Sequence, residues 1–347
     1  MKKSLNLLQI LRYLSVAALL FSLGSFYFHN SDYFWIEISF VIEISILTCL
    51  TRSTNMMNGG FALLNGIFLS AGATLLIAQV IGFLGFDIQN VFWSAYVFPW
   101  VEEISKLIPV LLFAYLLFKK DKVLPNISDF LFLGVMGGAG FSLFEKYFWD
   151  GISFDTTYGP HLGSVYFFPD ALGTYVSGDV LGYVGHSAAT GLIALGIGIG
   201  LYLKKKKKKE FRVAEQLSVK TSPSRSRFKL WWIAPLAGLL WIVLEHTLLN
   251  LYYANGSELL LLIGGGLLTP WVFLVATVVG LVLGGKLTFD FLKKYTGVKK
   301  ELDSDFKKLV SHIKSGHVVV DEIMKFFRKI RFANLIGWNR YSQIKIK

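Results

Sequence analysis

The stretch VFWSAYVFPWVEEISKLIPVLLFAYLLF, residues 91–118, has the length and apolar composition of a membrane-spanning helix. The exceptions are two prolines and three charged residues near its middle, Glu102, Glu103 and Lys106. At the bilayer centre these charges cost about 8–10 kcal/mol, whereas the fifteen Leu, Ile, Val and Phe residues contribute about 5–9 kcal/mol. The free energy of inserting this segment alone is therefore near zero, and its charged residues need polar partners from other helices. An ionisable cluster inside a membrane is a functional-site hypothesis by default.

Composition places the whole chain in the membrane. Its 347 residues are 54% hydrophobic and 16% aromatic, and the apolar stretches lack the alternation of outer-membrane strands. We therefore expect an all-α polytopic membrane protein. The single cysteine, Cys49, excludes an internal disulfide and a cysteine-based metal site.

The apolar stretches predict about eight transmembrane helices within a membrane-embedded domain of residues 1–289. Their approximate ranges are 7–28, 32–50, 60–86, 91–118, 128–149, 179–203, 230–254 and 259–288. The charged start and first apolar run also suit a signal peptide, but the run is long for one, which favours a retained first helix. Glu37 and Glu43 are further acids in the second span, and the sequence assigns them no role.

The distribution of Lys and Arg predicts the orientation. The loops near 29–31, 87–90, 150–178 and 255–258 contain neither residue, whereas every alternate loop is basic. This alternation indicates an even number of spans with both termini cytoplasmic, and we expect an integral protein of the cell (plasma) membrane.

Two basic regions account for much of the net charge of +12. Residues 204–229, which begin with six lysines, are predicted to form a flexible cytoplasmic linker. The tail, residues 290–347, has apolar residues at helical spacing from about 303 and predicts basic amphipathic helices. We expect both regions to bind anionic lipid and not nucleic acid.

Four of the expected spans carry polar residues on one face. Besides the opening stretch, these residues are Glu145, His186 with Thr190, and His246 with Asn250. From a rise of about 1.5 Å per residue, Glu102 lies about 17 Å, His186 about 10 Å and His246 about 12 Å below the outer surface. Glu145 lies shallower, at about 6 Å. With helix tilt, these groups can meet in a cavity open to the outside.

Chemistry narrows the use of such a cavity. Two His and one Glu form a common ligand set for catalytic zinc, which His186, His246 and Glu145 supply. Glu102 or Glu103, beside Lys106, is then a candidate general base for the bound water. Asn250 is a candidate for completing the site or for binding a developing oxyanion. Taken singly, each residue also suits hydrogen-bonded helix packing or an ion pair.

The ordered set of motifs resembles the PrsW family of intramembrane proteases, which are related to the type II CAAX prenyl endopeptidases. The resemblance covers roughly residues 60–285. It is carried by Glu102-Glu103-x-x-Lys106, Phe141-x-x-x-Glu145, Gly185-His186 and His246-x-x-x-Asn250. Glu145 favours PrsW, because the CAAX enzymes have His at the matching position.

The resemblance implies a membrane-embedded endopeptidase that cleaves a single-span membrane protein, often an anti-sigma factor, to begin regulated proteolysis. It also implies Glu102 and Glu103 as catalytic residues, and Glu145, His186 and His246 as metal ligands, with Zn²⁺ the expected ion. The family is described with both metal-dependent and glutamic-type mechanisms, so both stay open here. An ion- or proton-coupled transporter is the alternative, because acids and His in spans also build relays. A non-catalytic relative that binds transmembrane clients is a third interpretation.

Overall fold

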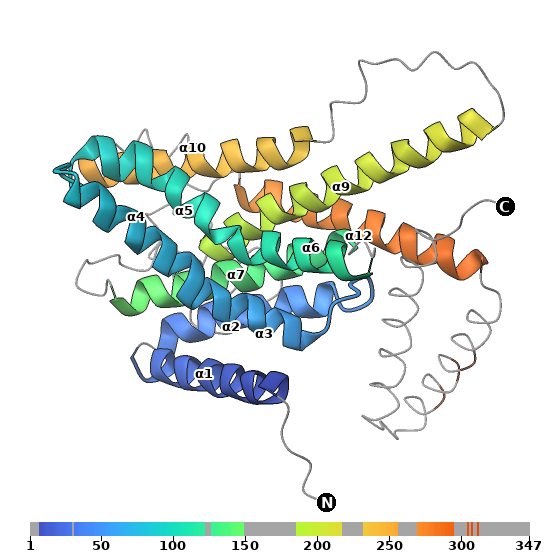
Figure 1. The fold of residues 1–347 in the computed structure, drawn as a ribbon, viewed down its shortest axis with the longest axis horizontal. Coiled ribbons are helices and arrows are strands. Elements are labelled where there is room, and N and C mark those ends of the chain that lie inside the picture. Colours follow the sequence, from blue (N-terminus) through green and yellow to red (C-terminus); the bar gives the residue numbers. More distant parts are fainter. Residues whose placement is uncertain are drawn as a thin grey trace, which may run out of the picture.

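The computed structural model describes residues 7–29, 31–121, 126–148, 185–216, 232–255 and 269–294, and the isolated positions 304, 307 and 311. Within these ranges all regular elements are helical (Figure 1). In chain order they are α1 (Leu7–His29), α2 (Ser31–Leu47), α3 (Met56–Asn65), the π-helix η1 (Gly66–Ser70), α4 (Ala71–Phe83), the π-helix η2 (Phe92–Val97), α5 (Phe98–Lys106), α6 (Ile108–Asp121), α7 (Ile127–Phe148), α9 (His186–Gln216), α10 (Ile233–Asn255) and α12 (Thr269–Lys294).

Several of these helices can cross a membrane by length and composition. In the described part of the chain they are Met56–Phe83, Ile127–Tyr147, His186–Leu203 and Ile233–Tyr252, with shorter apolar helices at Tyr13–His29 and Val272–Lys286. The predicted class, an all-α polytopic membrane protein, is confirmed. The number of eight spans stays a prediction, and the tail beyond residue 294 lies outside the described residues except for three positions.

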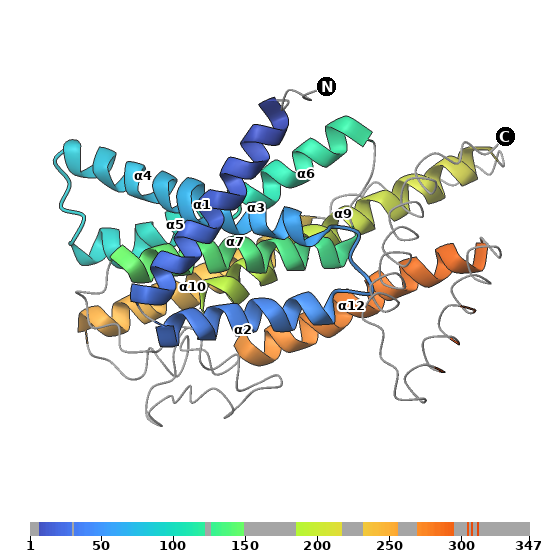
Figure 2. The same ribbon diagram turned by 90° about the horizontal axis from the view of Figure 1, so that it is seen from below.

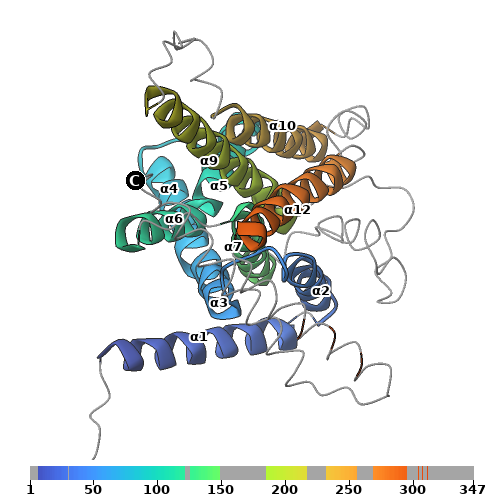
Figure 3. The same cartoon turned by 90° about the vertical axis from the view of Figure 1, so that its right-hand side faces the viewer.

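Helix α7 forms the centre of the bundle. Seen end-on, α2, α3, α9 and α12 surround it and α1 lies outermost (Figure 3). Of the apolar window of α7, 94% is buried inside the protein, compared with 28% for α10. Helices α2 and α12 lie against each other, with the rings of Phe40 and Phe273 5.8 Å apart (Figure 2). The bundle therefore surrounds α7 with protein and leaves α10 largely for lipid.

Small residues let α9 approach α7 closely. A Cβ at Gly134 would lie 2.8 Å from the carbonyl oxygen of Thr190, and one at Gly138 would overlap the carbonyl oxygen of His186. Small residues at helix interfaces allow backbones to approach in this way. The two backbones are therefore in contact where α9 begins.

The opening stretch, expected as one span, is divided into η2, α5 and α6. The division between α5 and α6 falls at Leu107, two residues before Pro109. Proline lacks an N–H, and its ring clashes with the carbonyl four residues earlier, so the helix breaks there. The break follows directly after Glu102, Glu103 and Lys106, at the end of α5.

Helix α9 differs from its predicted range at both ends. It begins at His186, because Gly185 has φ +85° and is not helical, and the expected start near residue 179 is therefore wrong. It continues through the lysine run to Gln216, so the flexible linker predicted from residue 204 is wrong as far as residue 216. Lys, Glu, Ala and Gln are good helix formers, and they extend the helix beyond its apolar part.

The Asp129 cluster joins the first turn of α7 to the loop before α3. The carboxylate of Asp129 accepts the backbone N–H groups of Ser53, Thr54 and Asn126 at 2.7, 2.8 and 2.6 Å. It also accepts the hydroxyls of Ser53 and Thr54 at 2.5 and 2.8 Å. Asp129 is fully buried, and all of these donors are uncharged. We define these four residues as the Asp129 cluster.

Candidate active site

Helix α5 supplies the charged centre of the site. Lys106 lies one turn after two acids, and its Nζ is 2.8 Å from Oε1 of Glu103 and 3.5 Å from Oε2 of Glu102. Residues three and four apart share one helix face, which brings these side chains together. The ammonium also lies 4.5 Å from the ring centre of Phe141 on α7. Lys106 is thus held by two acids of its own helix and by an aromatic face of α7.

His186 connects α5 to α7. Its Nδ1 is 2.5 Å from Nζ of Lys106, and its Nε2 is 2.5 Å from Oε2 of Glu145. A lysine ammonium can only donate, so Nδ1 accepts and Nε2 carries the proton that is donated to Glu145. This tautomer follows from the network of contacts. The imidazole therefore joins Lys106 and Glu145 into one polar chain.

His246 brings α10 to the same centre. Its Nδ1 lies 3.0 Å from Oε1 of Glu103, its Nε2 lies 3.8 Å from Oε2 of Glu102, and its ring centre lies 5.8 Å from that of His186. Ionisable groups of α5, α7, α9 and α10 thus lie within contact distance of one another. We define the catalytic cluster, named for the role that we propose for it, as Glu102, Glu103, Lys106, Glu145, His186 and His246.

Exposure divides the carboxylates of the catalytic cluster into two kinds. The side chains of Glu103 and Lys106 are 0% exposed, whereas those of Glu102 and Glu145 are 16% and 35% exposed. Glu103 makes close contacts with both Lys106 and His246, whereas the contacts of Glu102 are longer. Glu102 is therefore the acid of this pair that water can reach.

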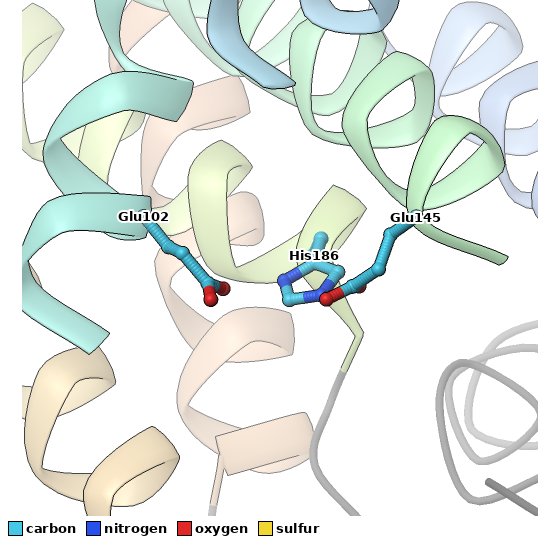
Figure 4. Close-up of side chains that lie close together, drawn as sticks. All are labelled: Glu102, Glu145 and His186. Carbon is cyan, nitrogen blue, oxygen red and sulfur yellow. The ribbon is translucent and has the colours of Figure 1, made fainter. Parts of the chain in front are cut away.

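Three members of the catalytic cluster have the arrangement of a metal site. One ligand atom from each of Glu102, Glu145 and His186 lies within 4.8 Å of the others, and His186 lies between the two carboxylates (Figure 4). The set predicted from sequence had His246 in place of Glu102. The difference arises because Nδ1 of His246 contacts Glu103, while the more exposed Glu102 faces His186.

The donor set and its charge fit a divalent cation. Nitrogen and carboxylate oxygen are ordinary zinc ligands. With neutral imidazoles, the catalytic cluster has three negative charges and one positive charge, a net charge of −2. Buried net charge is costly, and a divalent ion would neutralise it. Lys106 contacts Nδ1 of His186, so Nε2, which faces Glu145, is the nitrogen that would bind such an ion, in exchange for the proton that it carries in the metal-free arrangement.

Asn250 lies one turn beyond His246 and contacts the backbone of η2. Its Nδ2 donates to the carbonyl oxygen of Ser94 at 2.9 Å. In this π-helical segment Phe98 N–H bonds the carbonyl of Trp93, and the acceptor at Ser94 would need an N–H at residue 99, which is a proline. The amide of Asn250 supplies the missing donor and attaches α10 to the segment leading into α5.

The expected depth of Glu145 differed from that of His186, yet the two side chains are in contact. The reason is the corrected start of α9, since His186 is its first residue and not a residue one turn or more inside it. Glu145 lies three residues before the end of α7. Both side chains therefore come from helix ends on the same side of the bundle.

Sequence reasoning missed the part that α2 plays beside this site. Glu37 is buried, and Ser142 and Ser187 both donate to its carboxylate. Ser142 precedes Glu145 by about one turn, and Ser187 directly follows His186. The available signal was the presence of an acid inside an apolar span, which is unexpected unless the acid has a function.

The fold and the site define an integral membrane protein that gathers carboxylates, imidazoles and a lysine from four helices inside its bundle. The chain belongs to the PrsW family of intramembrane metalloproteases, whose family model matches residues 57–283, more than half of the chain. The predicted family is confirmed, and it is a family of membrane peptidases. Comparisons with the curated proteins and with the solved structures gave no match.

Proposed function

We propose that this protein is an endopeptidase that hydrolyses a peptide bond of a membrane-anchored protein at the catalytic cluster. The observation that carries the proposal is the continuous polar chain Glu103–Lys106–His186–Glu145, with Glu102 and His246 beside it. Intramembrane ionisable groups are costly, and six of them linked by a chain of contacts indicate chemistry.

The two adjacent acids of α5 take different roles. Glu102, partly exposed and loosely held, is the general base that removes a proton from the attacking water. Glu103 is buried against Lys106 and His246 and positions both. A division of labour between neighbouring carboxylates follows from their different environments.

A bound zinc ion, held by Glu145, His186 and one oxygen of Glu102, would supply a Lewis acid and lower the pKa of the attacking water, and the second oxygen of Glu102 would then accept the proton. The water oxygen forms a bond to the carbonyl carbon of the substrate, and Glu102 accepts a proton. The cation of Lys106, which contacts the acids of the catalytic cluster, offsets negative charge as the tetrahedral species forms. The C–N bond then breaks, and the proton held by Glu102 passes to the leaving amine.

The substrate we propose is a single-span membrane protein, cleaved in a step that begins regulated proteolysis of the anti-sigma-factor type. The supporting observation is the position of the catalytic cluster at one end of a helical bundle, where α9 begins and α7 ends. We further propose residence in the plasma membrane with cytoplasmic termini, and contact of the basic end of α9 with anionic lipid.

A comparison of cleavage products tests this function. Membranes of cells that express the wild-type chain or Glu102→Gln are compared by mass spectrometry of newly formed protein termini. We expect new termini within single-span proteins, present with the wild-type chain and absent with the variant. The strongest cleaved site then provides a fluorogenic peptide for assays in detergent micelles.

Metal analysis accompanies this assay. We expect about one equivalent of zinc in the purified wild-type protein and loss of cleavage with a chelator. If the same new protein termini formed with the wild-type chain and with Glu102→Gln, the endopeptidase assignment would be refuted. Proton flux into proteoliposomes without any cleavage would instead support a transporter.

A further inference from the structure

One buried carboxylate outside the catalytic cluster contacts both α7, which carries Glu145, and α9, which carries His186. Glu37 lies in α2 and is 2% exposed. The hydroxyl of Ser142 on α7 donates to its Oε1 at 2.8 Å, and the hydroxyl of Ser187 on α9 donates to its Oε2. Each carboxylate oxygen is thus assigned to a different helix.

These two serines lie where the site residues emerge. Ser187 follows His186 directly, and Ser142 precedes Glu145 by three residues, which is nearly one helical turn. A shift of either serine therefore moves the backbone that carries a member of the catalytic cluster. The 2.5 Å contact between Nε2 of His186 and Oε2 of Glu145 depends on the relative position of these two backbones.

The local backbone geometry does not by itself fix the position of the start of α9 relative to α7. Gly185 has φ +85°, a conformation that glycine adopts without strain, so the turn into α9 is set by a residue with no side-chain contacts of its own. At Gly138 the backbone of α7 touches the His186 carbonyl, which fixes how close the helices approach. The backbone contact at Gly138 alone would still allow α9 to slide or rotate against α7. The hydrogen bonds of Ser142 and Ser187 to the one carboxylate oppose these movements.

Packing alone is a poor explanation for an acid at this position. An acid inside an apolar bundle costs more than an aliphatic residue of similar size, whereas its two oxygens can accept hydrogen bonds from two different helices. The carboxylate is therefore suited to holding two groups in one geometry. Helix α2 also lies outside residues 57–283, so the family match does not assign a role to it.

We propose that Glu37 is a positioning residue of the active site, which holds Glu145 and His186 in register through Ser142 and Ser187. This inference rests on the proposed endopeptidase function. It makes α2 part of the catalytic machinery, with Glu37 acting through the two serines.

The test measures kcat and KM for the fluorogenic peptide, per folded protein, for a small set of variants. We expect Glu37→Leu to lower kcat about tenfold or more, with KM changed less than about twofold, as is typical when an outer hydrogen bond that orients a ligand is lost. Ser187→Ala should lower kcat in the same direction by less. Glu37→Gln retains the shape and one acceptor, and we expect it to keep most of the activity.

Glu43 offers a matched control, because it is a buried acid on the same helix. We expect Glu43→Leu to leave kcat within about twofold of the wild type. Melting temperatures of Glu37→Gln, Ser187→Ala and the double variant form a cycle that does not depend on catalysis, and their effects should not add.

The outcomes separate failure of this inference from failure of the proposed function. Wild-type activity in Glu37→Leu, additive melting shifts, or an equal loss in Glu43→Leu would each overturn the positioning role while the wild-type enzyme still cleaves. An inactive wild-type enzyme would overturn the proposed function itself, and with it any catalytic role for Glu37. A non-additive melting cycle without an effect on kcat would reduce Glu37 to a structural residue.

Discussion

The two ends of α7 each carry an acid, and the two acids have opposite surroundings. Asp129, in the first turn, accepts five hydrogen bonds from uncharged backbone and hydroxyl donors and is fully buried. Glu145, in the last turn, contacts the ionisable His186 and keeps 35% of its side chain exposed. The same helix thus has a closed polar cluster at one end and an open, titratable one at the other.

The comparison shows how a structural acid differs from a chemical one inside a membrane protein. Neutral donors that surround a carboxylate satisfy its acceptors and leave no site for another molecule, which suits the joining of a loop to a helix. Ionisable partners and an accessible oxygen leave room for a substrate, a water or a metal ion. The two acids therefore differ both in exposure and in the kind of partner that contacts them.

Among the variants that test this comparison, we expect the largest loss of activity from His186→Ala, at the Glu145 end of α7. The change removes the partner of both Lys106 and Glu145, and we expect cleavage of the fluorogenic peptide to fall about a thousandfold, within the range for loss of a general acid–base or ligand group. Zinc content should fall in the same protein. His29→Ala on α1 is the control, since its ring lies 4.6 Å from that of Tyr147, tilted by 48°, outside the catalytic cluster.

Gly138→Ala should produce the next largest effect. Its methyl group would overlap the carbonyl oxygen of His186 and force α9 away from α7. We expect cleavage to fall about 10- to 100-fold, because displacements of about 1 Å can cost that much in rate. Gly72→Ala is the control, since nothing lies near its added Cβ. Full activity in Gly138→Ala would contradict the close approach of the two helices.

Asn250→Ala should have a smaller effect on catalysis. The variant loses the hydrogen bond to Ser94, worth about 0.5–1.5 kcal/mol, and with it the attachment of α10 to the segment before α5. We expect cleavage to fall about two- to tenfold. A loss as large as that of His186→Ala would show that the amide acts on the substrate directly, as the oxyanion role predicted from sequence requires.

Asp129→Ala should have the smallest effect on the chemistry and a clear effect on stability. It leaves donors of Ser53, Thr54 and Asn126 without their acceptor, and we expect the free energy of unfolding to fall by about 2–4 kcal/mol. Thermal unfolding in detergent measures this loss. Cleavage per folded protein should stay near that of the wild type, and a strong decrease would remove the distinction between the two ends of α7.

Much of this protein could be predicted from its sequence because the relevant signals are local. The apolar stretches and their helical spacing predicted the class of fold, and the motifs on four spans predicted the family. The helix ends were less predictable. The expected start of α9 before Gly185 was wrong because an apolar composition does not reveal a glycine with positive φ. The linker predicted from residue 204 was wrong as far as Gln216 because charge alone does not prevent helix formation.

What the sequence determined by itself is which residues are ionisable, on which spans they lie, and which of them share a helix face, as Glu103 and Lys106 do. Only the tertiary structure decided which groups meet across helices. It placed Glu102 beside His186 and brought Glu103 into contact with His246. It also connected Glu37 to two serines more than a hundred residues away. The physical reason is that hydrophobicity and helical period act along neighbouring residues. Contacts between helices depend instead on where each helix begins, how closely its small residues allow another to approach, and how it is rotated.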